Sequence, residues 1–412
     1  MPAPSQYRVT RDIDVWCLAV AETIIWAGSL YLFAALLPYW ESELGWPKTH
    51  VAMVFSGALF MSALLSPTAG RLIDRDMGRS VLVLSATATA ILLVAVSFTQ
   101  SFALFACLWL AVGCCMAGSL YDPCFAYLVH SRGDNAKSAI TLVTLVAGFA
   151  GTLAFPVNTY VAELYNWRAS AQVFAGLIVC VALPCFWIGT RQRATVHETS
   201  SDQPPAKADD AAYKRARKTL TFWLLGLSFA LMYLNHGTVI THLLPKLEQQ
   251  QIPLEYAVFT ISLLGPSQVA GRVLMIVLER WISMRAIAVI SVLCLALAAI
   301  ALVFASYWQW LLPVFAVLQG SGVGISSITR PVIIAELLGR ESFGAIAGAI
   351  ALPVMVAMAI ASTVASGLWL VGGYDLVFAL NILFALVAVA ALMAALRIGP
   401  APWAHAANNP AD

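Results

Sequence analysis

Five ionisable residues interrupt stretches of the chain that are otherwise apolar: Glu22, Asp122, His236, Arg272 and Arg330. A charge near the centre of a lipid bilayer costs at least about 2.5 to 3.5 kcal/mol, so such residues pair with each other, face water or handle a substrate. A carboxyl group can take up a proton on one side of a membrane and release it on the other, and a guanidinium can hold a carboxylate with two parallel hydrogen bonds. The five residues therefore indicate chemistry on protons and on a charged solute within a membrane.

The elements that position these residues are predicted to be membrane-spanning helices. Of the 412 residues, 61% are hydrophobic and 11% are charged, which is typical of a polytopic membrane protein. A spanning helix needs about 20 mostly apolar residues, and the apolar runs are too long and unbroken for the strands of a β-barrel. We expect an all-α fold of twelve transmembrane helices with these approximate limits: 14–38, 49–70, 80–99, 102–129, 137–163, 168–190, 219–244, 254–278, 284–306, 308–335, 343–370 and 374–397.

Lysine and arginine residues gather on one side of these predicted spans. With a cytoplasmic N-terminus, eighteen of the 23 basic residues lie inside and three outside, and the remaining two are Arg272 and Arg330. Basic residues concentrate on the cytoplasmic side of membrane proteins. We therefore expect both termini in the cytoplasm, no removable signal before the first helix, and a multi-pass protein of a bacterial inner membrane.

One polar linker divides the predicted helices into six and six. Residues 191–218 contain paired prolines and a basic KRARK run, which is typical of a cytoplasmic loop beside lipid headgroups and argues against a nucleic-acid partner. We expect an N-terminal six-helix bundle over residues 1–190, the linker over 191–218 and a C-terminal six-helix bundle over 219–412. All eight cysteines fall within predicted helices, which favours reduced apolar residues over disulfides.

The two halves repeat one another at a shift of 205 to 208 positions. The matching pairs are Leu36-Leu37-Pro38 with Leu243-Leu244-Pro245, Asp74-Arg75 with Glu279-Arg280, and Asp122-Pro123 with Arg330-Pro331. Several landmarks in the same order at nearly one shift indicate an internal duplication. The duplication places Asp122 and Arg330 at equivalent positions of the two halves.

With this duplication, the chain resembles the major facilitator superfamily. Residues 70–79, Gly-Arg-Leu-Ile-Asp-Arg-Asp-Met-Gly-Arg, are similar to the signature of that family between helices 2 and 3, with one extra residue before Gly78. The resemblance implies two bundles of inverted three-helix repeats that rock about a site near the membrane midplane, lined by helices 1, 4, 7 and 10. It also implies that Asp74, Arg75, Gly78 and Arg79 take part in gating, because the family's loop latches the two halves when the cytoplasmic side is shut.

Glu22 and Asp122 are the expected proton-coupling residues. Glu22 lies about nine residues into the first helix, which is close to the bilayer centre. It can carry the transported proton, or it can be a structural acid that stays protonated and hydrogen-bonded. Asp122 and Arg330 are expected to form a gating pair on the cytoplasmic side, because the repeat register sets them opposite each other.

Arg272 is the expected anion ligand. Its place in helix 8 resembles that of the arginine that binds carboxylates in monocarboxylate porters and oxalate/formate exchangers, although Gln268 stands where the monocarboxylate pattern has an acid. This departure suggests that coupling has moved to Glu22 or Asp122. The alternative for Arg272 is a side chain that snorkels to the inner interface or pairs with Asp122.

The remaining candidates for substrate contacts are polar and aromatic side chains: Tyr31, Tyr121, Asn235, His236, Gln268 and Arg330. Histidine titrates near neutral pH and could relay protons, but a single histidine can also be a polar lining group. Methionine and cysteine near His236 and on helix 4 leave open a site for soft metals such as copper or arsenic.

These observations predict a proton-coupled secondary transporter of a small organic anion, most simply a carboxylate. We expect a monomer whose partners are protons, a small-molecule substrate and the bilayer, with no cofactor, no resident metal and no enzymatic activity. The alternative is an efflux transporter of amphipathic drug-like compounds or soft metals, with an aromatic lining from Trp26, Tyr31, Tyr121 and Tyr233. The compact glycine-proline-glycine motif of drug/proton antiporters is lacking in helix 5, which disfavours this alternative.

Overall fold

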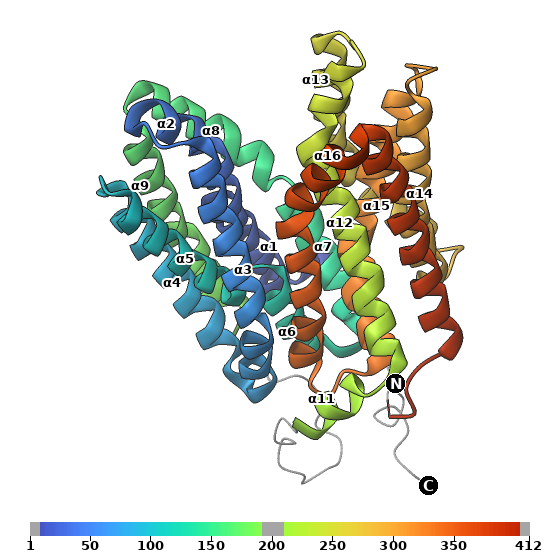
Figure 1. Ribbon diagram of the computed structural model, residues 1–412. Coiled ribbons are helices and arrows are strands. Elements are labelled where there is room, and N and C mark those ends of the chain that lie inside the picture. The colour runs from blue at the N-terminus through green and yellow to red at the C-terminus, as the bar shows by residue number, and fades with distance from the viewer. Residues whose placement is uncertain (1–8, 192–209, 404–412) are drawn as a thin grey trace, which may run out of the picture. The chain divides into compact units, whose positions relative to one another are not determined.

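The computed structural model describes residues 9–191 and 210–403, in which all regular structure is helical (Figure 1). Ten of these helical stretches are long and apolar enough to cross a membrane. The prediction of an all-α, multi-pass fold is thereby confirmed. Residues 192–209, most of the predicted linker, lie outside the described residues.

Contacts between residues group the chain into two compact units, one of residues 1–213 with 341–348 and the other of residues 214–340 with 349–412. The elements up to residue 191 are η1 (Val9–Arg11), α1 (Ile13–Trp26), η2 (Ala27–Tyr31), α2 (Leu32–Leu44), α3 (Lys48–Leu72), η3 (Ile73–Met77), α4 (Gly78–Ser97), α5 (Phe102–Ser119), α6 (Tyr121–Arg132), η4 (Gly133–Asn135), α7 (Ala136–Ala147), α8 (Ala150–Leu164), α9 (Trp167–Leu177), η5 (Ile178–Ala182) and α10 (Leu183–Gly189). From residue 210 onward they are α11 (Asp210–Arg217), α12 (Leu220–Gln249), α13 (Leu254–Leu278), α14 (Met284–Phe304), α15 (Leu311–Leu338) and α16 (Phe343–Ile398).

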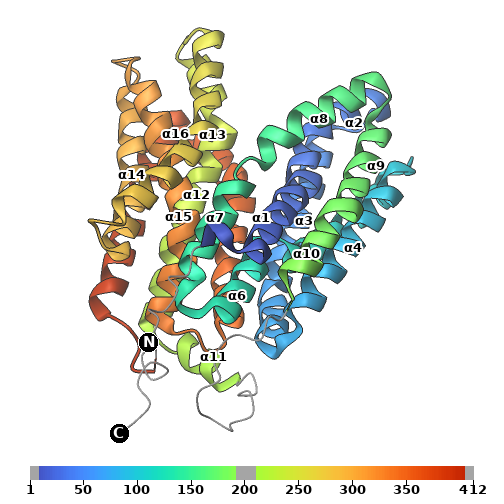
Figure 2. The same ribbon diagram turned by 180° about the vertical axis from the view of Figure 1, so that it is seen from behind.

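Each unit is a bundle of packed helices. In the first unit α1 packs against α7 and α10, and α5 packs against both α3 and α4 (Figure 2). In the second unit α15 packs against both α13 and α14. The exact domain limits expected from the sequence stay a prediction.

Two of the ten helical stretches are too long to be single spans. Thr49–Ser97 has 49 residues and Phe343–Ile398 has 56, whereas about 20 residues already cross the hydrocarbon core. Each stretch has non-helical backbone near its middle, at Arg75 and Asp76 in η3 and at Gly372 and Gly373 in α16 (Figure 1). These turns favour twelve crossings, a count that stays a prediction.

A predicted helix is interrupted close to one of the candidate acids. The helix expected over 102–129 ends at Ser119, because Leu120 adopts an extended backbone with φ −93° and ψ −167°. Pro123 has no backbone N–H, and its ring crowds the carbonyl group four residues earlier, which disfavours a regular helix at this point. The helix expected over 137–163 is likewise divided, between α7 and α8.

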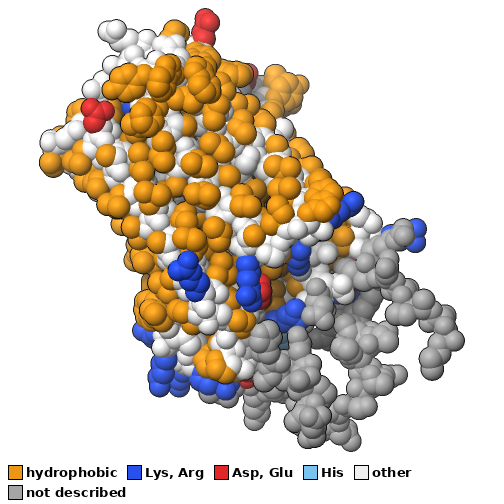
Figure 3. Space-filling model, turned by 90° about the vertical axis from the view of Figure 1, so that its right-hand side faces the viewer, with side chains coloured by type: hydrophobic (Ala, Val, Ile, Leu, Met, Phe, Trp, Pro, Cys, Tyr) orange, Lys and Arg blue, Asp and Glu red, His pale blue; other side chains and the backbone are white. Residues whose placement is uncertain are grey.

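The surface of the molecule is apolar where a bilayer would surround it. Figure 3 shows one face, on which hydrophobic side chains predominate, lysine and arginine side chains gather towards the lower part, and a few acidic side chains lie at the upper end. Large apolar side chains are widely exposed, among them Leu84, Ile91 and Phe304. An apolar belt with basic side chains along one edge is typical of a membrane protein.

Candidate functional site

Glu22 is the fully buried acid of the first unit. It lies on α1 with 0% of its surface exposed, and its carboxyl group neighbours the indole of Trp26 and the thiol of Cys124 on α6. Among the described residues neither carboxyl oxygen has a hydrogen-bond partner of good geometry. A buried polar group without such partners requires an explanation beyond packing. The two roles expected for Glu22, a proton carrier or a structural acid held by these neighbours, both stay predictions.

Asp122 lies in the first turn of α6, two residues after the break at Leu120. The N-terminus of a helix carries partial positive charge, which stabilises a carboxylate at this position. Asp122 is half-buried and is one of the charges that act on Glu22. The structure thus brings the two predicted proton-coupling acids into the same part of the first unit.

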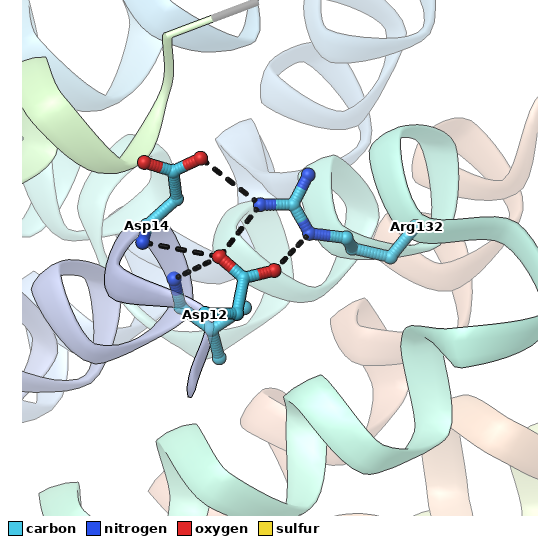
Figure 4. A network of polar contacts seen from close by, with 4 residues as sticks. Asp12, Asp14 and Arg132 are labelled. Atoms are coloured by element: carbon cyan, nitrogen blue, oxygen red, sulfur yellow. Dashed lines mark hydrogen bonds and ion pairs between the residues drawn. The ribbon is translucent and has the colours of Figure 1, made fainter. Parts of the chain in front are cut away.

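Arg132, near the end of α6, binds two aspartates at the start of α1 (Figure 4). Its Nε lies 3.1 Å from Oδ2 of Asp12, and its Nη2 lies 3.4 Å from Oδ2 of Asp14. Asp12 also caps α1, because its Oδ1 accepts hydrogen bonds from two backbone N–H groups of the first turn. This largely buried network ties together the two helices that carry Glu22 and Asp122.

Arg272 lies on α13 in the second unit and is buried against α15. It is 6% exposed, and its Nε donates a hydrogen bond to the carbonyl oxygen of Gly324 at 3.3 Å. The helices approach closely here because glycines line the contact; a Cβ on Gly271 would lie 2.6 Å from Cα of Ser321. Gln268, one turn earlier, is half-buried. The burial of Arg272 does not favour a side chain that snorkels to the interface, and its guanidinium keeps its charge even when buried.

Arg330 lies on α15 and is supported by an aromatic ring. It is 8% exposed, and its guanidinium carbon lies 5.9 Å from the ring centroid of Tyr233 on α12. A separation of up to about 6 Å allows a cation–π interaction. The ring therefore helps to position the second buried arginine of this unit.

His236 belongs to a buried polar network that joins three helices of the second unit. Nε2 of Gln319 on α15 donates a hydrogen bond to Oδ1 of Asn235 at 3.1 Å and lies 3.4 Å from Nδ1 of His236. Nδ2 of Asn235 donates in turn to the backbone carbonyl of Asn381 in α16 at 3.3 Å. Oε1 of Gln319 and the side-chain amide of Asn381 have no hydrogen-bond partner within the described chain. The network therefore has hydrogen-bonding capacity left for a polar group.

Asp74 caps the first turn of α16. Its Oδ1 accepts a hydrogen bond from the backbone N–H of Gly344 and its Oδ2 from that of Ala345, both at 2.8 Å. The first N–H groups of a helix have no partner within the helix, so the carboxylate satisfies them and meets the positive end of the helix dipole. The backbones touch here, since a Cβ on Gly70 would overlap the Gly344 carbonyl group. The contact is internal to the first unit, with which residues 341–348 group.

The chain between α3 and α4 turns sharply after Asp74. Asp76 adopts a left-handed backbone with φ 61°, a conformation that aspartate tolerates better than most residues, and so the chain accommodates the extra residue before Gly78. Arg75 is exposed, whereas the guanidinium of Arg79 stacks 3.4 Å above the ring of Trp187 on α10. The four predicted gating residues of this loop therefore have different surroundings, and Asp74 is the one of the four that caps α16.

The buried charged side chains of the described residues divide by sign between the two units. The acids Asp14 and Glu22 belong to the first unit, and the bases Lys246, Arg272 and Arg330 belong to the second. Burying a charge is costly unless it is compensated, so the placement of each sign is informative. Asp14 is paired with Arg132 within the first unit, so the difference between the units lies in Glu22 on one side and in the three bases on the other.

The sequence did not reveal two of these networks. Gln319 and Asn381 are neutral amides within apolar runs, and a search for buried amides as well as charges would have found them. The contact between Arg132 and Asp12 joins residues 120 positions apart, and no local pattern predicts it.

The comparisons with known proteins agree with this architecture. The model of the Major Facilitator Superfamily matches residues 18–313. The fold is similar to the crystal structure of the human organic anion transporter MFSD10 (TETRAN), with a TM-score of 0.71 and 16% identity over 94% of this chain and 100% of that chain. At this identity the likeness concerns the fold alone. No curated protein matches the sequence. Since the family match covers well over half of the 412 residues, the chain belongs to the Major Facilitator Superfamily.

Proposed function

We propose that this member of a transporter family is a proton-coupled carrier of an organic anion, most simply a carboxylate. The observation that supports it most is the division of buried charge, with acids in the first unit and Lys246, Arg272 and Arg330 in the second. The solved structure with a similar fold is itself an organic anion transporter, which favours the same class of solute here. We further propose a monomer with twelve crossings in two six-helix bundles, in a bacterial inner membrane, with both termini in the cytoplasm.

Arg272 is proposed to hold the carboxylate of the substrate. It is buried, permanently charged and already held through Nε by the Gly324 carbonyl group. A guanidinium fixed in this way loses little further side-chain entropy when it binds a carboxylate. Arg330, His236, Asn235 and the half-buried Gln268 are proposed to supply the other polar contacts, with Tyr31 and Tyr121 from the first unit.

Proton coupling is proposed to act through charge balance. Arg272 and Arg330 together carry two positive charges, and Glu22 and Asp122 when ionised carry two negative charges. Protonation of either acid leaves a net positive charge that an anion can neutralise. Glu22 is proposed as the carrier because it is the fully buried acid.

The cytoplasmic gate is proposed to have two parts. Asp74, with its neighbours Arg75, Gly78 and Arg79, holds the start of α16 in the closed state and releases it when the cytoplasmic side opens. The pair Asp122 and Arg330, which the internal repeat makes equivalent, seals the same side.

The test is a ligand screen followed by uptake. The purified full-length protein is heated in the presence of organic acids, amphipathic cations, or Cu and As species, because a ligand that binds the folded state raises its apparent stability by mass action. Stabilisation by organic acids, followed by uptake of the best of them into proteoliposomes, supports the proposal. Selective stabilisation by cations or metals overturns it.

One observation favours the efflux alternative. The first unit has half-buried aromatic side chains beside its buried acid, including Trp26 and Tyr121, and such a surface also suits an amphipathic cation. The structure offers less to the soft-metal form of this alternative, since no group of three or more His, Cys, Asp and Glu side chains in residues 9–191 and 210–403 could hold a metal ion.

A further inference from the structure

Five aromatic side chains form a row through the first unit, in the order Phe125, Tyr121, Trp26, Tyr31 and Phe155. The successive ring centroids lie 5.0, 4.6, 6.3 and 6.1 Å apart. These separations are those of interacting aromatic pairs. This ring row is therefore a continuous aromatic surface built from α6, α1, η2 and α8.

The backbone is specialised to form the ring row. Trp26 and Tyr31 are five positions apart, which in a regular α-helix would turn their side chains about 140° away from each other. The π-helix η2 (Ala27–Tyr31) widens the helix at this point, and the two rings come within 6.3 Å. Gly151 on α8 leaves room for Tyr31, because a Cβ there would lie 3.3 Å from the tyrosine ring. π-Helical turns are frequent at functional sites, and η2 follows directly on the part of α1 that carries Glu22.

The ring row is partly open and passes beside the buried acid at its middle member, Trp26. Trp26 follows Glu22 by one helical turn and neighbours its carboxyl group. Trp26, Tyr31 and Tyr121 are half-buried, and Phe155 is 45% exposed. Phe125, at the other end of the row, is covered. The open faces can receive a flat apolar group.

We propose that the ring row binds the planar aromatic body of the transported solute, which is therefore an aromatic rather than an aliphatic carboxylate. This rests on the proposed function, since it takes the solute to be an organic anion. An aromatic solute stacks on the rings and gains more than its buried area alone provides, whereas a saturated ring of the same size gains only the area. The five rings carry no charge, so the ring row supplies stacking and not the charge that holds the carboxylate.

The test compares two acids with the same carbon skeleton, one of them flat and aromatic and the other saturated. Binding of radiolabelled 1-naphthoate to the purified full-length protein is measured, with displacement by unlabelled 1-naphthoate or by its fully saturated counterpart, decahydro-1-naphthoate. Stacking at one or two rings predicts that the aromatic acid binds about 3- to 10-fold more tightly. The saturated acid is the more hydrophobic of the two, so partition into detergent cannot produce this preference.

Variants locate the preference in the ring row. Trp26→Leu and Tyr121→Leu should each remove most of it, whereas Trp26→Phe, which keeps a ring, should retain most of it. The matched control is Tyr165→Leu, at the end of α8, where the side chain is 75% exposed, and it should leave the preference unchanged.

The outcomes separate this inference from the proposed function. Equal affinity of the wild type for the two acids, or an undiminished preference in folded Trp26→Leu protein, overturns the role of the ring row while the anion carrier stands. Tighter binding of 1-naphthylmethylamine than of 1-naphthoate overturns both. A preference for 1-naphthoate that disappears in Trp26→Leu and survives in Tyr165→Leu supports the inference.

Discussion

Removal of the Asp74 carboxylate should release the first turn of α16. Asp74 accepts two hydrogen bonds of 2.8 Å, from the backbone N–H groups of Gly344 and Ala345. A hydrogen bond to a charged group contributes about 1.5 to 3 kcal/mol, so Asp74→Ala should weaken this contact by about 3 to 6 kcal/mol as an upper bound. Asp74→Asn keeps one carbonyl acceptor and loses the charge, so about half of that effect is expected.

Hydrogen exchange measured by mass spectrometry on the full-length protein reports this contact directly. The first N–H groups of a helix have no partner within the helix, so any protection of these two amides comes from outside it. Each 1.4 kcal/mol lost corresponds to about tenfold faster exchange, and the Asp74→Ala effect is therefore about 10²- to 10⁴-fold at most.

The control is Asp76→Asn, which removes the charge of an exposed carboxylate two residues away that pairs with His130 at 2.8 Å and keeps a side chain that suits the left-handed backbone at this position. It should leave exchange at residues 344 and 345 nearly unchanged. Exchange in Asp74→Ala that matches the wild type would refute the capping role. Equal acceleration in Asp74→Ala and Asp76→Asn would show a general loosening of the loop and refute it equally.

Four further experiments test the charged residues. Glu22→Gln should abolish accumulation driven by a proton gradient in proteoliposomes while leaving ligand binding measurable, and unchanged accumulation would contradict its role. Asp122→Arg and Arg330→Asp should each slow uptake alone and recover part of the rate together; a combined variant no faster than either single one argues against the gate. Arg272→Ala should weaken binding of an organic anion at least roughly tenfold, with Arg272→Lys between it and the wild type, because a charged hydrogen bond of about 1.5 to 3 kcal/mol is lost; unaltered anion affinity would disprove the carboxylate contact. Arg132→Ala leaves two largely buried aspartates without their cation, and the melting temperature in detergent should fall as for a loss of about 3 kcal/mol or more; an unshifted melting temperature would show that this network contributes nothing.

The sequence predicts the membrane-spanning helices well, because a long apolar run in this chain has few possible structures other than a membrane-spanning helix. It predicts their interruptions poorly. Asp122-Pro123 and Arg330-Pro331 are equivalent dipeptides of the two halves, yet the backbone breaks at Leu120 in the first half while α15 runs continuously through Pro331. Local sequence cannot distinguish the two cases, since a proline within a membrane helix is tolerated when neighbouring groups satisfy the freed carbonyl group.

The candidate site likewise contains residues that the sequence predicts and contacts that it does not predict. Glu22, Arg272 and Arg330 were predicted because a charge stands out in an apolar run, and all three are buried. The role of Asp74 as a cap for α16 depends on residues about 270 positions away, and the ring row depends on the π-helix η2. Both arise from tertiary packing, which periodicity does not encode.

The most direct test of the central claim is uptake of the most stabilising organic acid from the ligand screen into proteoliposomes that contain the wild-type protein, with and without an inward proton gradient. Passive permeation is subtracted with liposomes that contain no protein, and proteoliposomes that contain Arg272→Ala are measured in parallel. The account predicts that the gradient drives accumulation above the equilibrium level, that the label is accompanied by protons detected with a dye inside the vesicles, and that Glu22→Gln loses both. Uptake that ignores the gradient, or that is the same in the wild type and Arg272→Ala, would contradict a proton-coupled organic anion carrier.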